Sequence, residues 1–259
     1  MVSVQHIRNV CQREKLARFD GRGLIERSYA IHRYISTWLT WAFVNATPFV
    51  RPNHVSAAMI AIGLFGVFLL ALPSTELSVY GVLLLYLSFL LDKVDGDVAR
   101  FRNEYSRYGK FLDEIYHLAP QPLVYMAFGI HVYGKTGSTL ALMLGFVCHF
   151  GAIFRRVGPK FATIIAERFR ETASAAASTD TSAGLPTRVV KRRSTGGILM
   201  AFVVRFDVRL ATFLFALALE PALPMASGTE PAVVVLFVHA CVWTVRAFGK
   251  NRRLRRELT

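Results

Sequence analysis

The chain has 259 residues, of which 53% are apolar and 19% are charged, and its mean hydropathy is +0.38. This composition excludes a disordered chain and argues against an ordinary soluble domain, because so much apolar surface needs a lipid environment. The net charge of +14 is typical of proteins that bind nucleic acid or anionic membranes, and the positions of the basic residues decide between these classes.

The amino-terminal segment is rich in arginine and has no early apolar core, so we expect no cleavable signal peptide. Within it, residues 31–45 combine Arg33 with Trp38 and Trp41. This amphipathic and aromatic composition is typical of a helix in the membrane interface rather than of a spanning helix. We therefore predict a cytoplasmic arm with an interfacial helix over residues 1–51.

A transmembrane domain is predicted over residues 52–250. A helix needs roughly 20 apolar residues to cross about 30 Å of hydrocarbon. Six segments carry at most one acidic or basic side chain, and they cover residues 52–75, 77–91, 115–134, 136–154, 210–226 and 231–245. The sequence thus predicts an all-α integral membrane protein with six transmembrane helices that follow the interfacial helix.

Basic residues gather in the amino-terminal arm, in residues 100–110, in residues 155–195 and in the tail from Arg246. The alternate loops hold one basic residue, Lys135. The positive-inside rule then predicts a multi-pass protein of a bacterial-type inner membrane with both termini in the cytoplasm. Attraction to anionic lipids accounts for the net charge, and no nucleic acid is expected as a partner.

Two cytoplasmic segments complete the predicted organisation. Residues 157–195 are expected to form a linker, because their second half is rich in Ser, Thr and Ala and ends in basic residues. Residues 251–259 are expected to form a basic tail.

Acidic side chains cluster where the second and third predicted spans meet the cytoplasm. Asp92 and Asp95 are three residues apart, and Asp113 and His117 are four apart, so each pair lies on one helical face. Carboxylates this close need a counter-charge, and an oxygen-rich site suits Mg²⁺ or Mn²⁺. We therefore predict a divalent metal site here.

Small residues accompany this cluster. Gly96, Ala99 and Gly109 carry little side-chain bulk, so a flat or phosphorylated ligand can approach the backbone. Arg100 is placed to pair with a phosphate. Taken alone, each of these residues is also explained by helix packing or by an interfacial charge.

Together these residues form one spaced pattern, Asp92-x2-Asp95-Gly96-x2-Ala99-Arg100-x8-Gly109-x3-Asp113-x3-His117. It resembles the signature of the CDP-alcohol phosphotransferase family, D-x2-D-G-x2-A-R-x8-G-x3-D-x3-D, at seven of its eight fixed positions. Pro52, Asn53 and Ser56 also look like the P-N-x-x-T element that opens the first span in this family, with Ser in place of Thr.

The resemblance implies a membrane transferase of phospholipid biosynthesis. Such an enzyme moves a substituted phosphate from a CDP-linked donor, usually CDP-diacylglycerol, to an acceptor alcohol and releases CMP. It also implies a cytoplasmic active site and a homodimer. The residues it assigns are Asp92, Asp95, Asp113 and position 117 for two divalent ions, and Gly96, Ala99, Arg100, Gly109 and Asn53 for the CDP moiety.

His117 replaces the family's last aspartate, which is both a metal ligand and the general base. One interpretation is that the imidazole takes over these roles, because a neutral nitrogen accepts a proton or binds metal. A second is a subgroup with another acceptor or metal, in which the base is supplied elsewhere; Glu114 and Asp97 are nearby, but their helical phase points them away from Asp113. A third is a non-catalytic scaffold that binds CDP-lipid.

Basic residues near the predicted site are candidates for binding an acceptor phosphate. They are Lys110, Arg155, Arg156 and Arg209, with Arg205 beside the last of them. The topology rule alone also accounts for these charges, and Arg205, Asp207 and Arg209 could instead pair with each other across one turn.

A small cation transporter is the remaining alternative, in which the carboxylates bind a carried ion. The chain has no evident inverted repeat, which argues against this class. It also lacks the P-loop, G-x-G-x-x-G, H-E-x-x-H and G-x-S-x-G motifs, so NTPases, dinucleotide enzymes, zincins and serine hydrolases have no support.

Overall fold

The computed structural model describes residues 2–17, 24–47, 49–176, 205–220 and 231–258, and each regular element in these ranges is a helix. The predicted all-α class is therefore confirmed.

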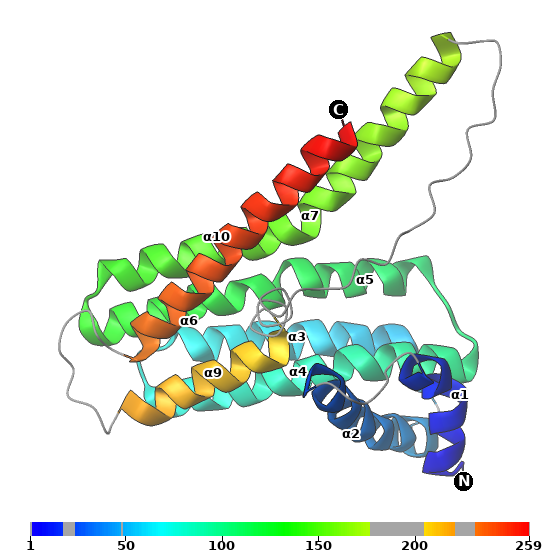
Figure 1. The fold of residues 1–259 in the computed structure, drawn as a ribbon. Coiled ribbons are helices and arrows are strands. Elements are labelled where there is room, and N and C mark those ends of the chain that lie inside the picture. Colours follow the sequence, from blue (N-terminus) through cyan, green and yellow to red (C-terminus); the bar gives the residue numbers. More distant parts are fainter. Residues whose placement is uncertain (1, 18–23, 48, 177–204, 221–230, 259) are drawn as a thin grey trace.

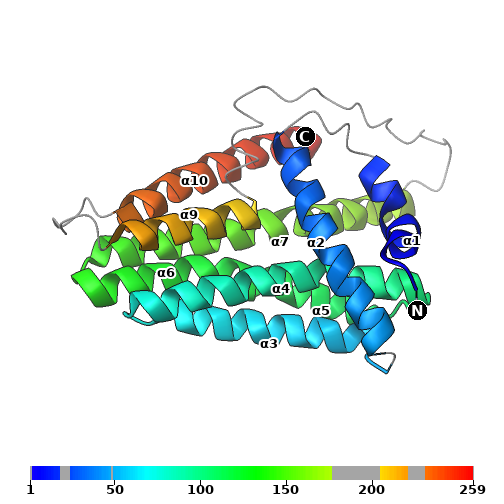
Figure 2. The same cartoon turned by 90° about the horizontal axis from the view of Figure 1, so that it is seen from below.

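Six helices of the described chain form the bundle; they lie lengthwise in Figure 2, but Figure 1 shows the last of them and the later part of Thr139–Ala176 inclined to the others. They are α3 (Pro52–Ala71), α4 (Thr75–Arg102), α6 (Pro120–Thr136), α7 (Thr139–Ala176), α9 (Phe206–Leu219) and α10 (Pro231–Leu258). Before them come α1 (Val4–Ala17) and α2 (Leu24–Ala46), and α2 crosses the bundle over α4 (Figure 2). The short helix α5 (Arg107–Leu118) follows α4 in the chain, packs against α3 and leads into α6. Helices α7 and α10 extend beyond the other helices (Figure 1).

Helices α3 and α4 pack closely because glycines face each other. A Cβ on Gly66 would lie 2.9 Å from the carbonyl oxygen of Gly81, and a Cβ on Gly81 would lie 2.6 Å from the backbone nitrogen of Leu70. Close approach of backbones through small residues is the usual way in which helices associate in membranes. This contact sets the position of α4, which carries most of the predicted site.

Three helices of the described chain are long and apolar enough to cross a membrane: Pro52–Ala71, Thr75–Arg102 and Thr139–Phe169. The apolar stretch Pro231–Trp243 is shorter, and the fifth predicted span runs past Glu220 into residues outside the described ranges. The integral-membrane class is thus supported, whereas the count of six spans stays a prediction.

The third predicted span, residues 115–134, is divided between two helices, so its continuity was predicted wrongly. Helix α5 ends at Leu118 and α6 begins at Pro120, with Ala119 between them at φ −112° and ψ −80°. Proline has no backbone N–H and disfavours helical geometry in the residue before it, so the break falls at Ala119. Asp113 and His117 consequently lie on a helix of their own.

The predicted linker, residues 157–195, lies only partly in the described ranges. Helix α7 continues to Ala176, so the first part of this segment is helical. Residues 177–204 lie outside the described ranges. The linker boundary stays a prediction.

The amino-terminal arm holds two helices, of which only the second was predicted. Helix α2 includes the predicted residues 31–45 and buries a polar face made by Arg33, Ser36, Thr37 and Thr40. The hydroxyls of Thr37 and Thr40 donate hydrogen bonds to backbone carbonyl oxygens one turn earlier, so these hydroxyls have partners within the helix. Its location in the membrane interface stays a prediction.

The acid of the fifth predicted span pairs with the single basic residue of the alternate loops. Nζ of Lys135 lies 2.6 Å from Oε2 of Glu220, and Nε2 of His131 lies 3.2 Å from Oε1. Nδ1 of His131 lies 2.8 Å from the hydroxyl of Ser78. The cluster joins α4, α6 and the end of α9, and it gives the buried His131 ring polar partners from two other helices.

Candidate active site

A cavity of about 480 Å³ lies between the start of α3, the carboxyl-terminal part of α4 and α5. Its lining consists of Pro52, Asn53, Ser56, Asp92, Asp95, Gly96, Ala99, Arg100, Glu104, Tyr105, Ser106, Gly109, Lys110 and Asp113. Every matched position of the spaced motif is in this set. Three separate segments of sequence therefore meet at one polar cavity, because the chain reverses between α4 and α5.

This reversal begins at Asn103, which caps α4 in the left-handed region at φ 55°. Asparagine tolerates this conformation better than most residues. The side chain of Ser106 then caps α5 by accepting a hydrogen bond from the backbone N–H of Gly109 at 2.8 Å. The short connection brings the acids of α5 beside those of α4.

Asp92, Asp113 and His117 form the most compact group of possible ligands. Nε2 of His117 lies 3.6 Å from Oδ1 of Asp92 and 3.6 Å from Oδ1 of Asp113. One donor atom from each of the three residues lies within 4.8 Å of the others. Two carboxylates and an imidazole in this arrangement suit Mn²⁺ or Mg²⁺. Burial raises the pKa of the Asp113 carboxyl, and the nearby His117 side chain lowers it by a smaller amount.

Asp95 lines the same cavity but is held by protein groups. Its Oδ2 accepts a hydrogen bond of 2.8 Å from the hydroxyl of Ser56, and its Oδ1 accepts one from the backbone N–H of Gly96. The serine that replaces threonine in the P-N-x-x-T element therefore contacts a predicted ligand directly. Asp95 keeps two oxygens with further lone pairs on a polar cavity wall.

Lys93 supplies a positive charge that the sequence analysis did not consider. Its Nζ lies 3.4 Å from Oδ2 of Asp92, 3.3 Å from the carbonyl oxygen of Phe89 and 3.4 Å from the centre of the Phe89 ring. The side chain is buried. Asp92 thus has Lys93 on one oxygen and His117 on the other, which offsets part of the cost of a carboxylate in this place.

Gly109 is required by the contact between α5 and α3. A Cβ on Gly109 would lie 2.7 Å from Oδ1 of Asn53 and 3.0 Å from the hydroxyl of Ser106. That hydroxyl donates to Oδ1 of Asn53 at 2.9 Å. The absence of a side chain at Gly109 therefore leaves room for the Asn53 side chain. The sequence analysis predicts a different reason for this glycine, namely close approach of a ligand.

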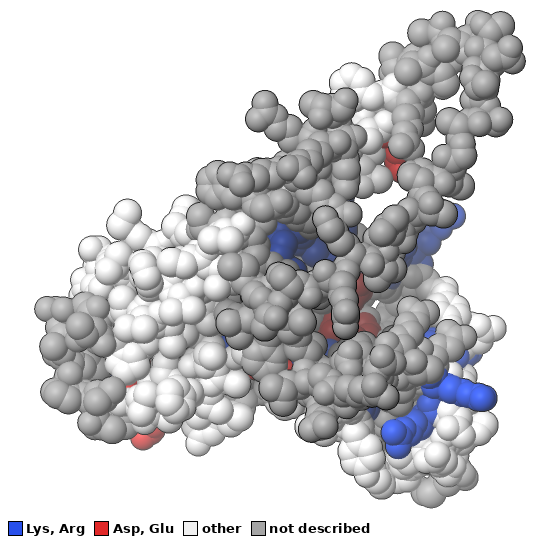
Figure 3. All heavy atoms as spheres, in the orientation of Figure 1, with Lys and Arg blue, Asp and Glu red and all other residues white. Residues whose placement is uncertain are grey.

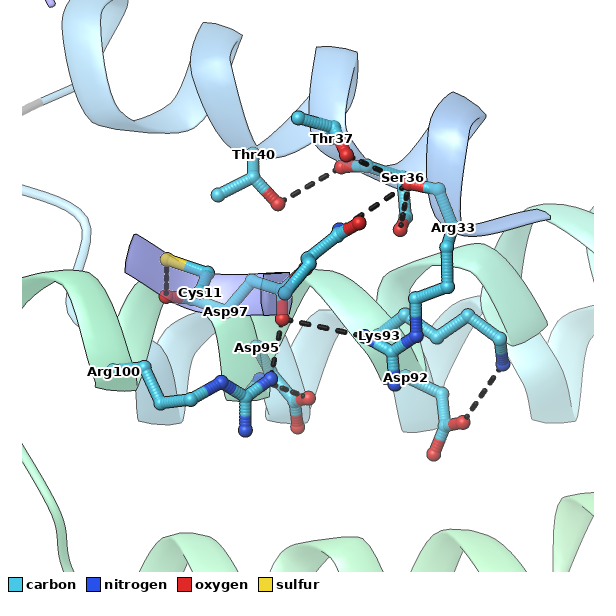
Figure 4. Close-up of polar contacts among 12 residues, drawn as sticks. Cys11, Arg33, Ser36, Thr37, Thr40, Asp92, Lys93, Asp95, Asp97 and Arg100 are labelled. Carbon is cyan, nitrogen blue, oxygen red and sulfur yellow. Dashed lines mark hydrogen bonds and ion pairs between the residues drawn. The ribbon is translucent and has the colours of Figure 1, made fainter. Parts of the chain in front are cut away.

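Arg100 lines the cavity and is held from behind by Asp97. Nη2 of Arg100 donates to Oδ1 of Asp97, which is fully buried. Asp97 also accepts from Arg33 and Gln12, and Figure 4 shows it between the two guanidinium groups. Asp97 is not part of the cavity lining, which agrees with a helical phase that points it away from Asp113. Its contacts with Arg33 and Gln12 were not predicted.

The residues predicted to bind an acceptor phosphate do not lie together at one site. Lys110 lines the cavity, whereas Arg156 donates twice to Glu114, at 3.0 and 3.1 Å. The Arg155 guanidinium lies 5.1 Å from the Trp243 ring, and buried Arg209 lies 4.8 Å from the Phe206 ring. Of the four predicted acceptor residues, only Lys110 is therefore part of the cavity lining.

Two further predictions concern these charges. The helical phase predicts that Glu114 points away from Asp113. Lys160 also contacts Glu114, at 2.6 Å, so Glu114 faces α7 and not the cavity. Hydrogen bonds from Arg156 hold the pKa of Glu114 at about 2. Of the predicted pairing among Arg205, Asp207 and Arg209, the contact of Arg205 with Asp207 is present, with 2.7 Å between Nη2 and Oδ2.

The described surface is divided by charge. In Figure 3 the visible Lys and Arg atoms lie in the middle of the view, where α7 and α10 cross, and over the end that carries α1 and α5. The opposite end, where α6 meets α7, is largely white in this view. A polar, basic end beside an apolar body is typical of a membrane protein with one aqueous face.

Known proteins and protein families include matches to this chain. A protein of Aquifex aeolicus (strain VF5), described as an uncharacterized protein, is 35% identical to this chain over 113 residues. The match covers 41% of this chain and 54% of that protein, so the chain spans about half the length of this relative. The family model of CDP-alcohol phosphatidyltransferase matches residues 49–248, which include the whole cavity lining. The chain therefore belongs to the CDP-alcohol phosphatidyltransferase family.

Proposed function

We propose that this protein is a metal-dependent transferase that moves a phosphatidyl group from CDP-diacylglycerol to an acceptor alcohol and releases CMP. The observation that carries the proposal is the meeting of Asp92, Asp95, Arg100 and Asp113 around one cavity in a chain of this family. Family membership supplies the reaction class, and the cavity supplies groups that suit a diphosphate and its cations.

In the proposed reaction the acceptor oxygen forms a bond to the phosphorus that carries the diacylglycerol. The bond from this phosphorus to the bridging oxygen breaks, and CMP leaves with the electron pair. Bound divalent cations would neutralise the charge on the leaving CMP and orient the diphosphate. Asp92, Asp113 and His117 would hold one cation, and Asp95 would complete a second site from the same cavity.

The remaining groups orient the donor. Arg100 would contact its phosphates with the guanidinium nitrogens that Asp97 does not engage. Gly96 and Ala99 would leave room for the cytidine, and Asn53 would offer its amide. His117 would act as a metal ligand or would take the acceptor's proton, and these roles give different kinetic results.

A lipid donor is favoured by a second cavity. It has a volume of about 710 Å³ and lies between α2, α4 and α9. Most of its walls are apolar, with Val82, Leu83, Leu214 and Phe215 among the lining residues. A groove of this kind suits acyl chains, whereas a soluble CDP-alcohol has no group to fill it.

The acceptor would enter on the side of Lys110, the predicted acceptor residue that lines the metal cavity. We propose that both termini and this cavity face the cytoplasm. The visible basic atoms over the end that carries α1 and α5 support that orientation. Homodimer formation is proposed from the family resemblance.

The test is release of CMP from CDP-diacylglycerol by purified protein with Mg²⁺ or Mn²⁺ and a panel of alcohols. Asp92→Ala and Asp92→Asn should each lower the rate at least about a hundredfold. Substitution of residues that only support a metal ligand already lowers metal affinity or activity about 10- to 100-fold. Glu76→Gln is the matched control, since Glu76 is an exposed acid at the other end of the same helix.

Each alternative function gives its own result. Metal-dependent binding of CDP-diacylglycerol without CMP release, by the natural chain and by His117→Asp, would support a scaffold. Cation uptake into vesicles that does not depend on a cytidine compound would support a transporter. Absence of both binding and turnover would show that the donor is wrong.

A further inference from the structure

A buried carboxylate behind the cavity joins the amino-terminal helices to the donor-binding arginine. Asp97 has no exposed surface, and its Oδ1 accepts from Nη1 of Arg33 at 3.2 Å and from Nη2 of Arg100. Its Oδ2 accepts from Nε2 of Gln12 at 2.8 Å. The thiol of Cys11 donates to its backbone oxygen at 3.3 Å.

The charges of this network leave an excess at Arg100. A buried carboxylate is stable only when it is paired and hydrogen-bonded. Arg33 is itself buried and neutralises Asp97 in formal charge. Arg100 adds a second positive charge to the same oxygen, and its side chain keeps 27% of its surface exposed. Arg100 therefore shares its carboxylate partner with a second guanidinium and keeps part of its side chain exposed at the cavity.

The network also limits how Arg100 can move. A long arginine side chain loses rotamer entropy when it is ordered, so a site gains affinity when this ordering precedes binding. Asp97 lies one turn before Arg100 and holds one of its terminal nitrogens. Gln12 and Arg33 in turn hold Asp97, as Figure 4 shows for Arg33.

We propose that Asp97 is a positioning residue that holds Arg100 ready for the donor phosphates, and that α1 and α2 are part of the site through Gln12 and Arg33. The proposal rests on the proposed function. Asp97 occupies a variable position of the motif, and Gln12 and Arg33 lie before residues 49–248, which match the family model. The device is therefore a feature of this chain beyond the motif.

The test compares Asp97→Asn, which keeps the shape and removes the charge, with the natural chain. The measurements are the Kd for CDP-diacylglycerol in detergent micelles with Mn²⁺, and the KM and kcat for CMP release. We expect Kd and KM to rise about tenfold, the effect of losing one charge-assisted hydrogen bond, with kcat at saturating donor changed less than about twofold.

A double-mutant cycle separates positioning from general damage. If Asp97 acts through Arg100, then Asp97→Asn should have no further effect on Kd in an Arg100→Gln background. Arg102→Gln is the matched structural control. Arg102 ties the same end of α4 to the backbone oxygens of Phe43, Thr47 and Val50 but does not contact Asp97 or line the cavity. This control should lower thermal stability and leave Kd unchanged.

The outcomes distinguish this proposal from the proposed function. An unchanged Kd in Asp97→Asn, independent effects of the two substitutions, or an equal effect of Arg102→Gln would each overturn the positioning role. If the natural chain binds CDP-diacylglycerol but releases no CMP, the transferase fails while the Kd ratio still decides the role of Asp97. A natural chain that binds no CDP-diacylglycerol overturns both.

Discussion

Nε2 of His117 lies 3.6 Å from Oδ1 of Asp92, a residue on another helix. The same nitrogen is 3.6 Å from Oδ1 of Asp113, so one imidazole faces a carboxylate from α4 and another from α5. A nitrogen lone pair between two carboxylates lies where a shared cation would bind. The relationship favours a ligand role for the residue that departs from the family motif.

Replacement of His117 tests this role. His117→Asp should tighten Mn²⁺ or Mg²⁺ binding about tenfold, because an added carboxylate increases the negative charge of the ligand set. His117→Ala should weaken it about tenfold, with kcat recovered to within about threefold at saturating metal. The measurement is the metal dependence of CMP release. A large loss of kcat in His117→Ala that saturating metal does not restore would assign the base role instead.

Metal removal should affect activity and stability together. Chelation with EDTA should abolish CMP release, and Mn²⁺ or Mg²⁺ should restore it. Because Asp92, Asp95 and Asp113 share one cavity, a bound cation also relieves their mutual repulsion. Thermal unfolding at saturating metal should therefore occur at a higher temperature than in EDTA. In Asp92→Asn this shift should be smaller, and an undiminished shift would place the cation elsewhere.

The contact of Gly109 with Asn53 predicts a specific loss of activity. Gly109→Ala adds a Cβ that would lie 2.7 Å from Oδ1 of Asn53, so that side chain has to move. We expect CMP release to fall about tenfold, the scale of a lost charge-assisted or oriented hydrogen bond. Gly158→Ala is the control, because its Cβ would meet nothing within 4 Å. Equal activity of the two variants would show that the Asn53 contact does not matter.

The ion pairs of Glu114 predict a pH dependence of stability and not of catalysis. The pKa of Glu114 is held at about 2, below its ordinary 4.5, so the contribution is fully present above pH 4.5 and is lost as the pH falls toward 2. Glu114→Gln should be less stable than the natural chain by up to about 1 kcal/mol at pH 7, since the pair is partly exposed. Thermal unfolding of both proteins across this range would measure it. A difference that does not shrink between pH 4.5 and pH 2 would contradict the assignment.

The sequence was sufficient for those parts of the site that depend on local geometry. Spacings of three and four residues place Asp92 with Asp95, and Asp113 with His117, on single helical faces, and the structure brings the two faces to one cavity. The all-α class followed in the same way from the long apolar segments. The break at Ala119 was also foreseeable, because Pro120 follows it directly.

Contacts between distant segments could not be predicted from local patterns. The partner of Arg156 is Glu114, which is 42 residues away, and the partner of Asp97 is Arg33, 64 residues away. Nothing in the spacing of the basic residues separates Lys110, which lines the cavity, from Arg156, which is already paired. Lys93 was missed for a different reason, since its flexible stem brings its charge back to Asp92, the residue just before it.

The three donors around Asp97 have a consequence for the evolution of related chains. An acid at position 97 is tolerable in a fully buried place only while Arg33 and Gln12 remain to compensate it. In an alignment of close relatives, positions 12, 33 and 97 should therefore change together. Positions 92 and 113 should vary independently of these three, because their carboxylates face the cavity and have other partners.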